Sequence, residues 1–346
     1  MKKIAFFDTK PYDHTFFEKY GKDYEIKYFD NKLNADTAAL AAGFDGVIAF
    51  VNDDLSAKTI EKLYEGGVRV AALRCAGYNN VDFRAAYEKI TVVRVPAYSP
   101  YAVAEHAIAL LLTLNRKVHK AYNRTRDFDF RLSGLVGFDL FGKTIGVIGT
   151  GKIGRCFVSI CKGFSMKVLA YDPYPAKDSD IDYTDLDTLL AESDIISLHC
   201  PLTESTRHMI NEDTIAKMKD GAYIINTSRG QLIDSEQLLS ALKNGKIGGA
   251  GLDVYEEEGE FFFEDFSQTI VKDDILSLLV SLPNVIITSH QAFLTGEALE
   301  NIAKTTINNL DEFFSDGKLT NEICYQCKTG DIGANCEKRK KGERCF

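Results

Sequence analysis

The stretch Thr144–Asp172, TIGVIGTGKIGRCFVSICKGFSMKVLAYD, decides the fold of this chain. It begins with a short apolar run, Ile145–Ile148, which predicts a β-strand. A glycine-rich turn follows directly, and the amphipathic run Ile153–Phe164 then predicts a helix. A second, mostly apolar run, Lys167–Tyr171, predicts another strand, which the acidic residue Asp172 closes. The stretch therefore has the strand–turn–helix–strand order of a dinucleotide-binding unit.

The glycine-rich turn has the spacing Gly149-x-Gly151-x-x-Gly154, and each glycine has a physical task. Gly149 permits the tight turn, Gly151 lets the backbone approach a pyrophosphate, and Gly154 lets the helix pack closely on the strand. Free N–H groups at the helix N-terminus attract the anion. Asp172, 18 residues after Gly154, can accept hydrogen bonds from an adenosine ribose and would repel a 2′-phosphate. The motif therefore favours NAD over NADP; the alternative is three turn glycines in an ordinary βα unit.

Length and composition exclude several other classes of protein. The chain has 346 residues, enough for two domains of ordinary size, and 45% of its residues are hydrophobic. A formal net charge of −9 argues against nucleic-acid binding and against attraction to an anionic membrane. No apolar run is long enough to span a bilayer, and the N-terminal patch Ile4–Phe7 is too short for a secretion signal. The eight cysteines do not form the pattern of a secreted disulfide framework, so we expect a cytoplasmic protein.

Strand-like and helix-like patterns alternate along both halves of the chain. The expected strands of the first hundred residues are Ile4–Phe7, Glu25–Phe29, Val47–Phe50, Val68–Leu73 and Thr91–Val95. The expected helices between them are Tyr12–Tyr20, Ala35–Ala42, Ser56–Glu65 and Asp82–Glu88, and a long helix over Tyr101–His119 follows the proline-rich turn at residues 96–100. Later strands are expected at Ile195–His199, Tyr223–Thr227, Gly249–Asp253 and Val285–Thr288. This alternation predicts an α/β protein with two doubly wound parallel-sheet domains, one flavodoxin-like and one a Rossmann domain.

Three polar residues follow three of the later strands, at the sheet edge where the cofactor is expected. Arg229 stands in the run NTSRG, Glu258 in DVYEEE and His290 in TSHQA. Arginine can clamp a carboxylate and polarise a ketone, and histidine can hand a proton to the oxygen as hydride arrives at carbon. A nearby glutamate favours the charged imidazolium. The three together predict reduction of a 2-oxo acid, although each residue alone is compatible with a structural role.

A second candidate site is the loop CAGYNNVD at residues 75–82, which follows the expected strand Val68–Leu73. It stands at the carboxyl end of a parallel strand, where ligands of open α/β sheets bind, and its free N–H groups can hold a carboxylate. A plain Gly/Asn turn that caps the next helix at Asp82 fits the same residues equally well.

Several long sequence blocks resemble those of the D-isomer-specific 2-hydroxyacid dehydrogenases, and within that family most closely the fermentative D-lactate dehydrogenases. The blocks are CAGYNNVD at 75–82, PAYSPYAVAEHA at 96–107, GKTIGVIGTGKIG at 142–154, NTSRGQLID at 226–234, GLDVYEEE at 251–258 and SHQAFLT at 289–295. The resemblance extends from residue 1 to about residue 322. It implies reduction of pyruvate to D-lactate with NADH. It also implies a homodimer formed through the cofactor domain, and leaves open whether dimers pair further into tetramers.

The resemblance implies roles for individual residues as well. Arg229 would clamp the substrate, His290 would be the acid/base, and Glu258, chosen among three successive glutamates by its spacing from Asp253, would be the partner of His290. The pyruvate pocket would be lined by Ala76, Gly77, Tyr78, Tyr98 and Phe293. The NAD contacts would be Gly149, Gly151, Lys152, Ile153, Gly154, Asp172, Cys200, Pro201, Thr206, Thr227, Ser228 and Asp253, and Asp253 would meet the nicotinamide carboxamide.

The resemblance also divides the chain. Residues 1–100 and 297–322 would form the substrate domain, residues 101–296 the inserted NAD-binding domain, and residues 323–346 a cysteine-rich tail that departs from the family. Four thiols stand in this tail, at Cys324, Cys327, Cys336 and Cys345. Only the first pair has the CxxC spacing of a zinc site, so we expect a disordered extension without a stoichiometric metal. The other cysteines, Cys75, Cys156, Cys161 and Cys200, are expected to be small buried hydrophobic residues.

Two alternatives to a D-lactate dehydrogenase remain open at the level of sequence. One is a related enzyme that acts on a larger 2-oxo acid. Tyr98 and Phe293 make the expected pocket small and aromatic, which favours pyruvate, but a preference for one methylene is worth only about 1–3 kcal/mol. The other is a non-enzymatic scaffold that senses NADH. The lack of long extra binding segments argues against this alternative.

Overall fold

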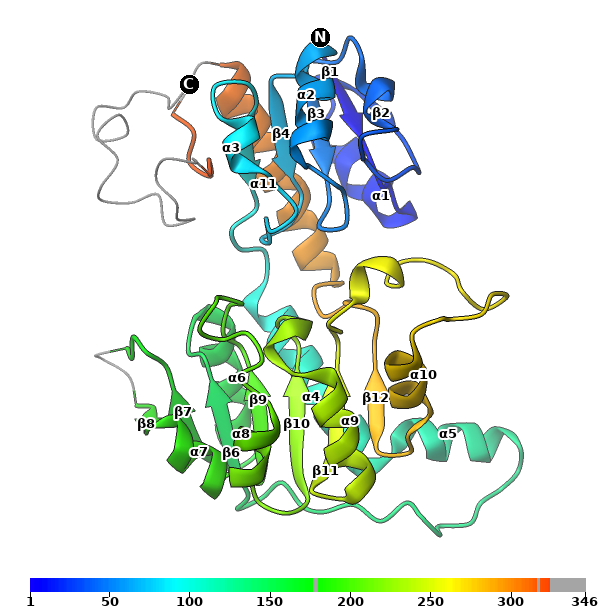
Figure 1. The fold of residues 1–346 in the computed structure, drawn as a ribbon, viewed down its shortest axis with the longest axis vertical. Coiled ribbons are helices and arrows are strands. Elements are labelled where there is room, and N and C mark those ends of the chain that lie inside the picture. The colour runs from blue at the N-terminus through cyan, green and yellow to red at the C-terminus, as the bar shows by residue number, and fades with distance from the viewer. Residues whose placement is uncertain (177–179, 316–317, 324–346) are drawn as a thin grey trace. The chain divides into compact units, whose positions relative to one another are not determined.

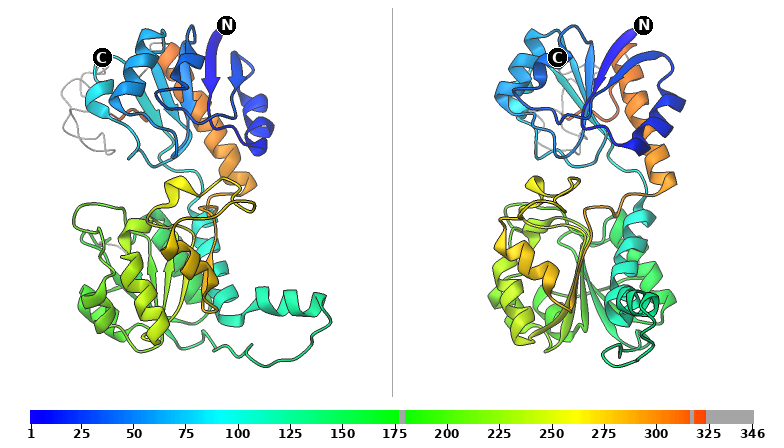
Figure 2. Two further views of the ribbon diagram at one scale, coloured as in Figure 1. Left: turned by 45° about the vertical axis from the view of Figure 1, so that its right-hand side comes forward. Right: turned by 90° about the vertical axis from the view of Figure 1, so that its right-hand side faces the viewer.

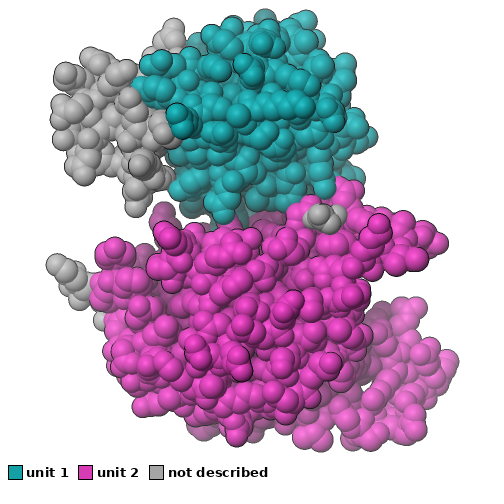
Figure 3. All heavy atoms as spheres, viewed as in Figure 1, with its two compact units in different colours: residues 1–99, 295–346 teal, residues 100–294 magenta. Residues whose placement is uncertain are grey.

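The computed structural model of the protein describes residues 1–176, 180–315 and 318–323. The chain divides into two compact units, shown in two colours in Figure 3. Unit 1 comprises Met1–Ser99 together with the residues from Thr295 onward, and unit 2 comprises Pro100–Leu294. Each unit is built around its own parallel β-sheet (Figure 1).

Unit 1 contains a five-stranded sheet with the strand order β2-β1-β3-β4-β5. Its strands are β1 (Lys2–Phe6), β2 (Tyr24–Tyr28), β3 (Gly46–Ala49), β4 (Val70–Leu73) and β5 (Thr91–Arg94). Its helices are α1 (Pro11–Tyr20), α2 (Ala57–Glu65), α3 (Phe83–Ala86) and α11 (Gly296–Phe314). Every residue of β3 and β4 is buried, because the central strands of a parallel sheet are covered by helices on both faces. The backbone N–H of Ile323 donates to Val92 O at 2.9 Å, so the chain remains part of this unit up to residue 323.

Unit 2 contains a seven-stranded parallel sheet with the order β12-β11-β10-β9-β6-β7-β8. Its strands are β6 (Thr144–Ile148), β7 (Lys167–Tyr171), β8 (Asp182–Tyr183), β9 (Ile195–Leu198), β10 (Ala222–Asn226), β11 (Ile247–Leu252) and β12 (Val285–Ile287). The chain runs outward from β6 through β7 to β8, then returns to the other side of β6 at β9. Ligands of such sheets bind at the carboxyl ends of the strands beside this reversal.

Helices cover both faces of the sheet of unit 2 and form two apolar cores. They are α4 (Pro100–Arg116), α5 (Val118–Arg126), α6 (Lys152–Gly163), α7 (Leu186–Glu192), α8 (Glu212–Lys217), α9 (Ser235–Asn244) and α10 (Asp274–Ser281). One core includes Leu111 of α4 and Phe157 of α6. The other includes Leu189 of α7, Leu238 of α9 and Leu279 of α10. Helix α5 and the segment that follows it extend away from the body of the unit (Figure 2).

The predicted fold class, two parallel-sheet α/β domains, is confirmed, while two predicted helices are wrong in detail. The helix expected over Ala35–Ala42 is only a short 3₁₀ turn, η1 (Ala38–Ala41). The helix expected over Tyr101–His119 ends at Arg116, because Lys117 adopts a left-handed conformation with φ 52° and a new helix, α5, starts at Val118. His119 therefore lies on α5. No helix in the described part of the chain is long and apolar enough to cross a membrane.

Four of the eight cysteines lie within the described ranges, and all four are free thiols. Cys75, Cys161 and Cys200 are buried, as expected, and Cys156 is only half-buried. The tail cysteines Cys324, Cys327, Cys336 and Cys345, and the zinc question attached to them, lie outside the described residues. Within the described residues, no group of histidine, cysteine and acidic side chains is arranged to hold a metal ion.

Candidate functional site

The glycine-rich turn joins β6 to α6 with the geometry that a pyrophosphate site requires. Gly149 has a φ of +93°, in a region that L side chains rarely adopt. A Cβ on Gly154 would stand 2.0 Å from the carbonyl oxygen of Gly149, so only glycine permits the start of α6 to pack so closely on the turn. The position of Gly151 faces open space, and α6 begins immediately after it with Lys152 and Ile153. The turn thus presents a helix N-terminus and a bare backbone, which fits a bound dinucleotide.

Asp172 follows β7, at the same edge of the sheet, and its carboxylate is fixed by the turn. Its Oδ2 atom accepts hydrogen bonds from the backbone N–H of Thr150 at 2.7 Å and from the Thr150 hydroxyl at 3.0 Å. Its Oδ1 atom accepts one from the backbone N–H of Tyr174 at 2.9 Å. The role of Thr150 was not predicted, because that residue occupies a variable position of the glycine motif. The arrangement fits recognition of a ribose diol by a held, charged carboxylate.

The ends of β9 and β10 supply further polar groups along this edge. Ser228 donates its hydroxyl proton to Cys200 O at 2.6 Å, which joins the two strand ends. Thr206 donates to Pro201 O at 2.8 Å. Burial raises the pKa of the Cys200 thiol to about 11, so this side chain remains neutral. The hydroxyl of Thr227 is buried and has no hydrogen-bond partner among the described residues. Buried hydroxyl groups are usually hydrogen-bonded, so this one fits a hydrogen bond to a bound cofactor.

His290 and Glu258 form a direct pair. The Nδ1 atom of His290 lies 2.8 Å from Glu258 Oε1, and both side chains are largely buried. The other carboxylate oxygen of Glu258 accepts a hydrogen bond from the backbone N–H of Tyr255 at 3.0 Å, so the carboxylate is held on both sides. His290 itself has a φ of 53°, a left-handed conformation that turns the chain sharply after β12. Because Nδ1 faces a carboxylate, this nitrogen carries a proton and Nε2 is the nitrogen available to a substrate.

The three successive glutamates have different environments in the structure. Glu258 contacts His290, whereas Glu256 contacts a different histidine, His208, with Nε2 of His208 2.5 Å from Glu256 Oε1. Glu257 is exposed. The structure therefore brings Glu258, and not its two neighbours, to His290. The His208–Glu256 pair was not foreseen, because the two residues are 48 positions apart and neither belongs to the glycine motif.

Asp253, at the end of β11, fastens the loop that carries His290. Its two carboxylate oxygens accept hydrogen bonds from the backbone N–H groups of Gln291–Ala292, at 2.9 and 2.8 Å, and from the Thr288 hydroxyl at 2.5 Å. The ring of His106 lies 3.3 Å away. Burial alone would raise the pKa of Asp253, but these hydrogen bonds outweigh burial and lower it. The same ring of His106 also contacts the Thr288 hydroxyl, 3.1 Å from its Nε2 atom.

Arg229 follows β10 on a loop that is anchored by its own neighbours. Asn226 donates its side-chain amide to Arg229 O at 2.9 Å, and its carbonyl oxygen accepts the backbone N–H of Ser228 at 3.0 Å. The guanidinium donates to Ser228 O at 2.7 Å. Arg229, Glu258 and His290 therefore stand at the carboxyl ends of β10, β11 and β12, three adjacent strands of one sheet.

The candidate substrate loop, Ala76–Tyr78, belongs to unit 1 and is held by Arg94. The guanidinium of Arg94 donates to Ala76 O at 2.7 Å and lies over the ring of Tyr78, 4.9 Å from its centroid. The thiol of Cys75 donates to Gly77 O at 3.3 Å. Tyr98 is in the same unit and accepts a hydrogen bond at its carbonyl from Asn301, at 2.8 Å. Phe293 lies in unit 2, three residues after His290 in the sequence, and its side chain is buried.

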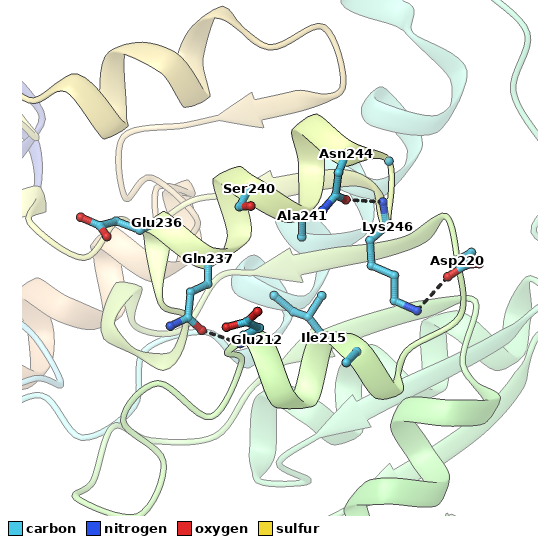
Figure 4. A pocket seen from close by; sticks show the side chains of 11 residues that line it. Glu212, Ile215, Asp220, Glu236, Gln237, Ser240, Ala241, Asn244 and Lys246 are labelled. Atoms are coloured by element: carbon cyan, nitrogen blue, oxygen red, sulfur yellow. Dashed lines mark hydrogen bonds and ion pairs between the residues drawn. The ribbon is translucent and has the colours of Figure 1, made fainter.

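A surface pocket of about 790 Å³ lies between α8 and α9, as Figure 4 shows. Its lining includes the apolar residues Ile215 and Ala241 and polar residues such as Glu212 and Asn244. None of Arg229, Glu258 and His290 lines it. The candidate active site is therefore at the carboxyl ends of β10, β11 and β12, and not in this pocket.

Comparison with known proteins agrees with this geometry. Residues 108–292 match the family model described as D-isomer specific 2-hydroxyacid dehydrogenase, NAD binding domain. The D-lactate dehydrogenase of Escherichia coli K12 is 51% identical over 327 residues, which cover 93% of this chain and 99% of that protein. The solved structure of the pyruvate reductase of Chlamydomonas reinhardtii matches with a TM-score of 0.89 at 45% identity, covering 93% and 98% of the two chains. The apo-structure of the E. coli D-lactate dehydrogenase matches with a TM-score of 0.86 at 49% identity, covering 93% and 99%.

Proposed function

The chain belongs to the D-isomer-specific 2-hydroxyacid dehydrogenases, and from this premise we propose that it reduces pyruvate to D-lactate with NADH. Membership makes it an NAD-dependent oxidoreductase that acts on a 2-oxo or 2-hydroxy acid. The proposal adds the substrate, the direction of the reaction and the roles of individual residues. It places the reaction in the cytoplasm.

His290 is the acid in the proposed reaction. Its Nδ1 proton is held by Glu258 at 2.8 Å, so the ring has one fixed orientation and Nε2 is free to donate a proton to the ketone oxygen. The ring that donates this proton carries a proton on each nitrogen, and Glu258 faces the one on Nδ1. After transfer, the neutral ring keeps its proton on Nδ1, and Nε2 is ready to accept a proton in the reverse reaction.

Arg229 is the proposed substrate clamp. A guanidinium presents parallel N–H donors in the geometry of a carboxylate, and it can at the same time polarise an adjacent ketone. By the family resemblance, backbone N–H groups of Ala76, Gly77 and Tyr78 would also bind the carboxylate, and Tyr98 and Phe293 would contact the methyl group of pyruvate. Two aromatic side chains beside the methyl group would favour pyruvate over bulkier 2-oxo acids.

The residues that would hold NAD lie along the edge of the sheet of unit 2. The pyrophosphate would contact the glycine turn and the start of α6, at Lys152 and Ile153. Asp172 would accept hydrogen bonds from the ribose, and Thr227 and Asp253 would lie toward the nicotinamide end. When bound, NADH supplies the hydride that reduces the ketone carbon.

The observation that carries the proposal is the His290–Glu258 pair at the cofactor edge, and it gives a direct test. We expect His290→Gln to bind NADH with nearly unchanged affinity, measured by NADH fluorescence, but to lose pyruvate reduction by several orders of magnitude. A panel of 2-oxo acids with NADH and NADPH, followed at the nicotinamide absorbance, tests the substrate. Faster turnover of a branched or aromatic 2-oxo acid would reassign the substrate, and turnover of none would favour an NADH-sensing scaffold.

We further propose that the protein is a homodimer joined through unit 2. From the start of α5 to the segment before β6, the chain presents large apolar side chains that are each more than half exposed: Val118, Tyr122, Phe128, Phe130, Leu132, Val136 and Phe141. So many exposed apolar groups in one segment are unusual for a monomer and typical of a protein interface. A second copy is the proposed occupant, because one segment per chain gives a symmetric contact. Light scattering of Phe130→Ser/Leu132→Ser should show a monomer; an unchanged mass would contradict the proposal.

A further inference from the structure

A second histidine–carboxylate cluster lies outside the proposed catalytic residues. His208 stands between β9 and α8, and its Nε2 atom lies 2.5 Å from Glu256 Oε1. Its Nδ1 atom lies 3.8 Å from Asp234 Oδ2. The side chain of Glu256 is 14% exposed, and that of His208 is 32% exposed. The ring is thus placed between two carboxylates, one on the loop after β11 and one at the N-terminus of α9.

The backbone on either side of His208 is bound to the loop that carries Arg229. The N–H of His208 donates to Gln231 O at 2.9 Å, and the N–H of Ile210 donates to Leu232 O at 3.0 Å. The N–H of Asp234 returns a hydrogen bond to Ile210 O at 2.9 Å. The backbone of His208 is therefore hydrogen-bonded to the loop that carries Arg229, while its side chain contacts a different loop.

The loop across from His208 is the one that carries Glu258. Glu256 lies two residues before Glu258, and the Tyr255–Glu256 peptide packs directly on Gly230. A Cβ on Gly230 would stand 2.0 Å from the carbonyl carbon of Tyr255. The two loops are therefore in backbone contact at one point, and the His208–Glu256 hydrogen bond is a second connection between them.

We propose that His208 is a positioning residue, which binds Glu256 and thereby holds the Glu258 loop in register with the Arg229 loop. The hydrogen bond has a charged acceptor, and such bonds are shorter and stronger than neutral ones. Loss of this bond frees the Glu258 loop to shift, which changes the distance between the carboxylate that orients His290 and the guanidinium of Arg229. The inference rests on the proposed roles of Arg229, Glu258 and His290.

The conformation of His208 allows a test that separates this role from a backbone role. His208 has a φ of 49°, and asparagine tolerates this left-handed region better than glutamine does. Glutamine, however, places its amide N–H groups where Nε2 stood and can still donate to Glu256, whereas asparagine is too short. If His208 matters only for its backbone, His208→Asn is the milder change. If its side chain positions Glu256, His208→Gln is the milder change.

The experiment measures kcat and KM of His208→Gln and His208→Asn with whichever 2-oxo acid the wild type turns over fastest, together with NADH affinity by fluorescence. We expect His208→Asn to lose about tenfold in kcat/KM, the size of one charge-assisted hydrogen bond, with NADH affinity within about twofold. His208→Gln should retain most of kcat/KM. Glu256→Ala should match His208→Asn, and the double variant His208→Asn/Glu256→Ala should be no worse than either, because the two residues form one connection.

A matched control is His14→Asn, which removes a histidine that faces Glu18 in an exposed pair on α1. It should leave kcat/KM unchanged. Equal activity of His208→Asn and the wild type would overturn the inference, and so would a milder effect of asparagine than of glutamine. If the wild type turns over no 2-oxo acid, the proposed function fails instead, so the two failures are distinguishable.

Discussion

Substitution of Gly230 by alanine tests the idea that the relative position of two loops determines activity. Gly230 follows Arg229, and its added methyl group would stand 2.0, 2.1 and 2.4 Å from the carbonyl carbon and oxygen of Tyr255 and the nitrogen of Glu256. All three are backbone atoms of the loop that leads to Glu258. Non-bonded carbon atoms rest about 3.5–4.0 Å apart, so the loops must separate by roughly 1.5 Å.

The size of the effect follows from this displacement. A misplacement of about 1 Å in a reacting group costs on the order of 10²-fold in rate, and overpacking costs about 1–3 kcal/mol in stability. We therefore expect Gly230→Ala to fold, to lose about 100-fold in kcat/KM for the 2-oxo acid, and to show a lower Tm. NADH affinity should fall much less than turnover, because the glycine turn and Asp172 follow β6 and β7, away from this contact.

Steady-state kinetics, NADH fluorescence titration and thermal unfolding measure the three quantities. The matched control is Gly259→Ala, one residue after Glu258, where an added methyl group meets no atom within 4 Å. It should retain activity and Tm. The reasoning is refuted if Gly230→Ala has wild-type kcat/KM. It is also refuted if Gly230→Ala loses NADH affinity in proportion to turnover, because the damage would then not be local to the two loops.

Three further changes have expected outcomes. Arg229→Lys should raise the KM for pyruvate and lower kcat together in steady-state kinetics, because an ammonium lacks the two-pronged donor geometry; an unchanged KM would remove Arg229 from the carboxylate. Asp172→Ala should reduce the preference for NADH over NADPH in binding titrations, and equal use of both cofactors by the wild type would contradict the role of Asp172. Truncation after Ile323, whose backbone N–H is bonded to β5, should preserve turnover, and metal analysis under reducing conditions should find no stoichiometric zinc in the full chain; one zinc per chain, lost on truncation, would contradict this.

The sequence predicted the parallel sheets well, because their buried strands are short apolar runs bounded by turn residues. Lys167–Tyr171 was predicted with the bounds it has in the structure, the other predicted strands differ by one or two residues at their ends, and the two-residue strand β8 was not predicted. The break at Lys117 was missed because neither glycine nor proline marks it, although the residue is left-handed. The helix over Ala35–Ala42 was wrong because its alanines carry helix propensity while a side-chain network around Asn34 and Thr37 favours a tight turn.

The contacts of the candidate site could be predicted only in part. Motif spacing located the strand ends, but it could not choose Glu258 among three successive glutamates without the family resemblance. The structure makes the choice through distance, since Glu258 faces His290 and Glu256 faces His208. The His208–Glu256 contact has no local signal, because long-range pairs depend on how β9, β10 and β11 lie side by side.

Asp253 shows why a single residue in such a site resists assignment from sequence. The family resemblance implied a contact with the nicotinamide, and in the structure both of its carboxylate oxygens bind groups of the protein. Those groups belong to the loop on which His290 adopts its left-handed conformation, and the backbone N–H of His290 donates to Asp253 O at 2.7 Å. The conformation of a histidine that would otherwise be strained is thus determined by an aspartate 37 positions earlier. The catalytic geometry proposed for this family member therefore depends on contacts between strand ends as much as on the three residues that carry the chemistry.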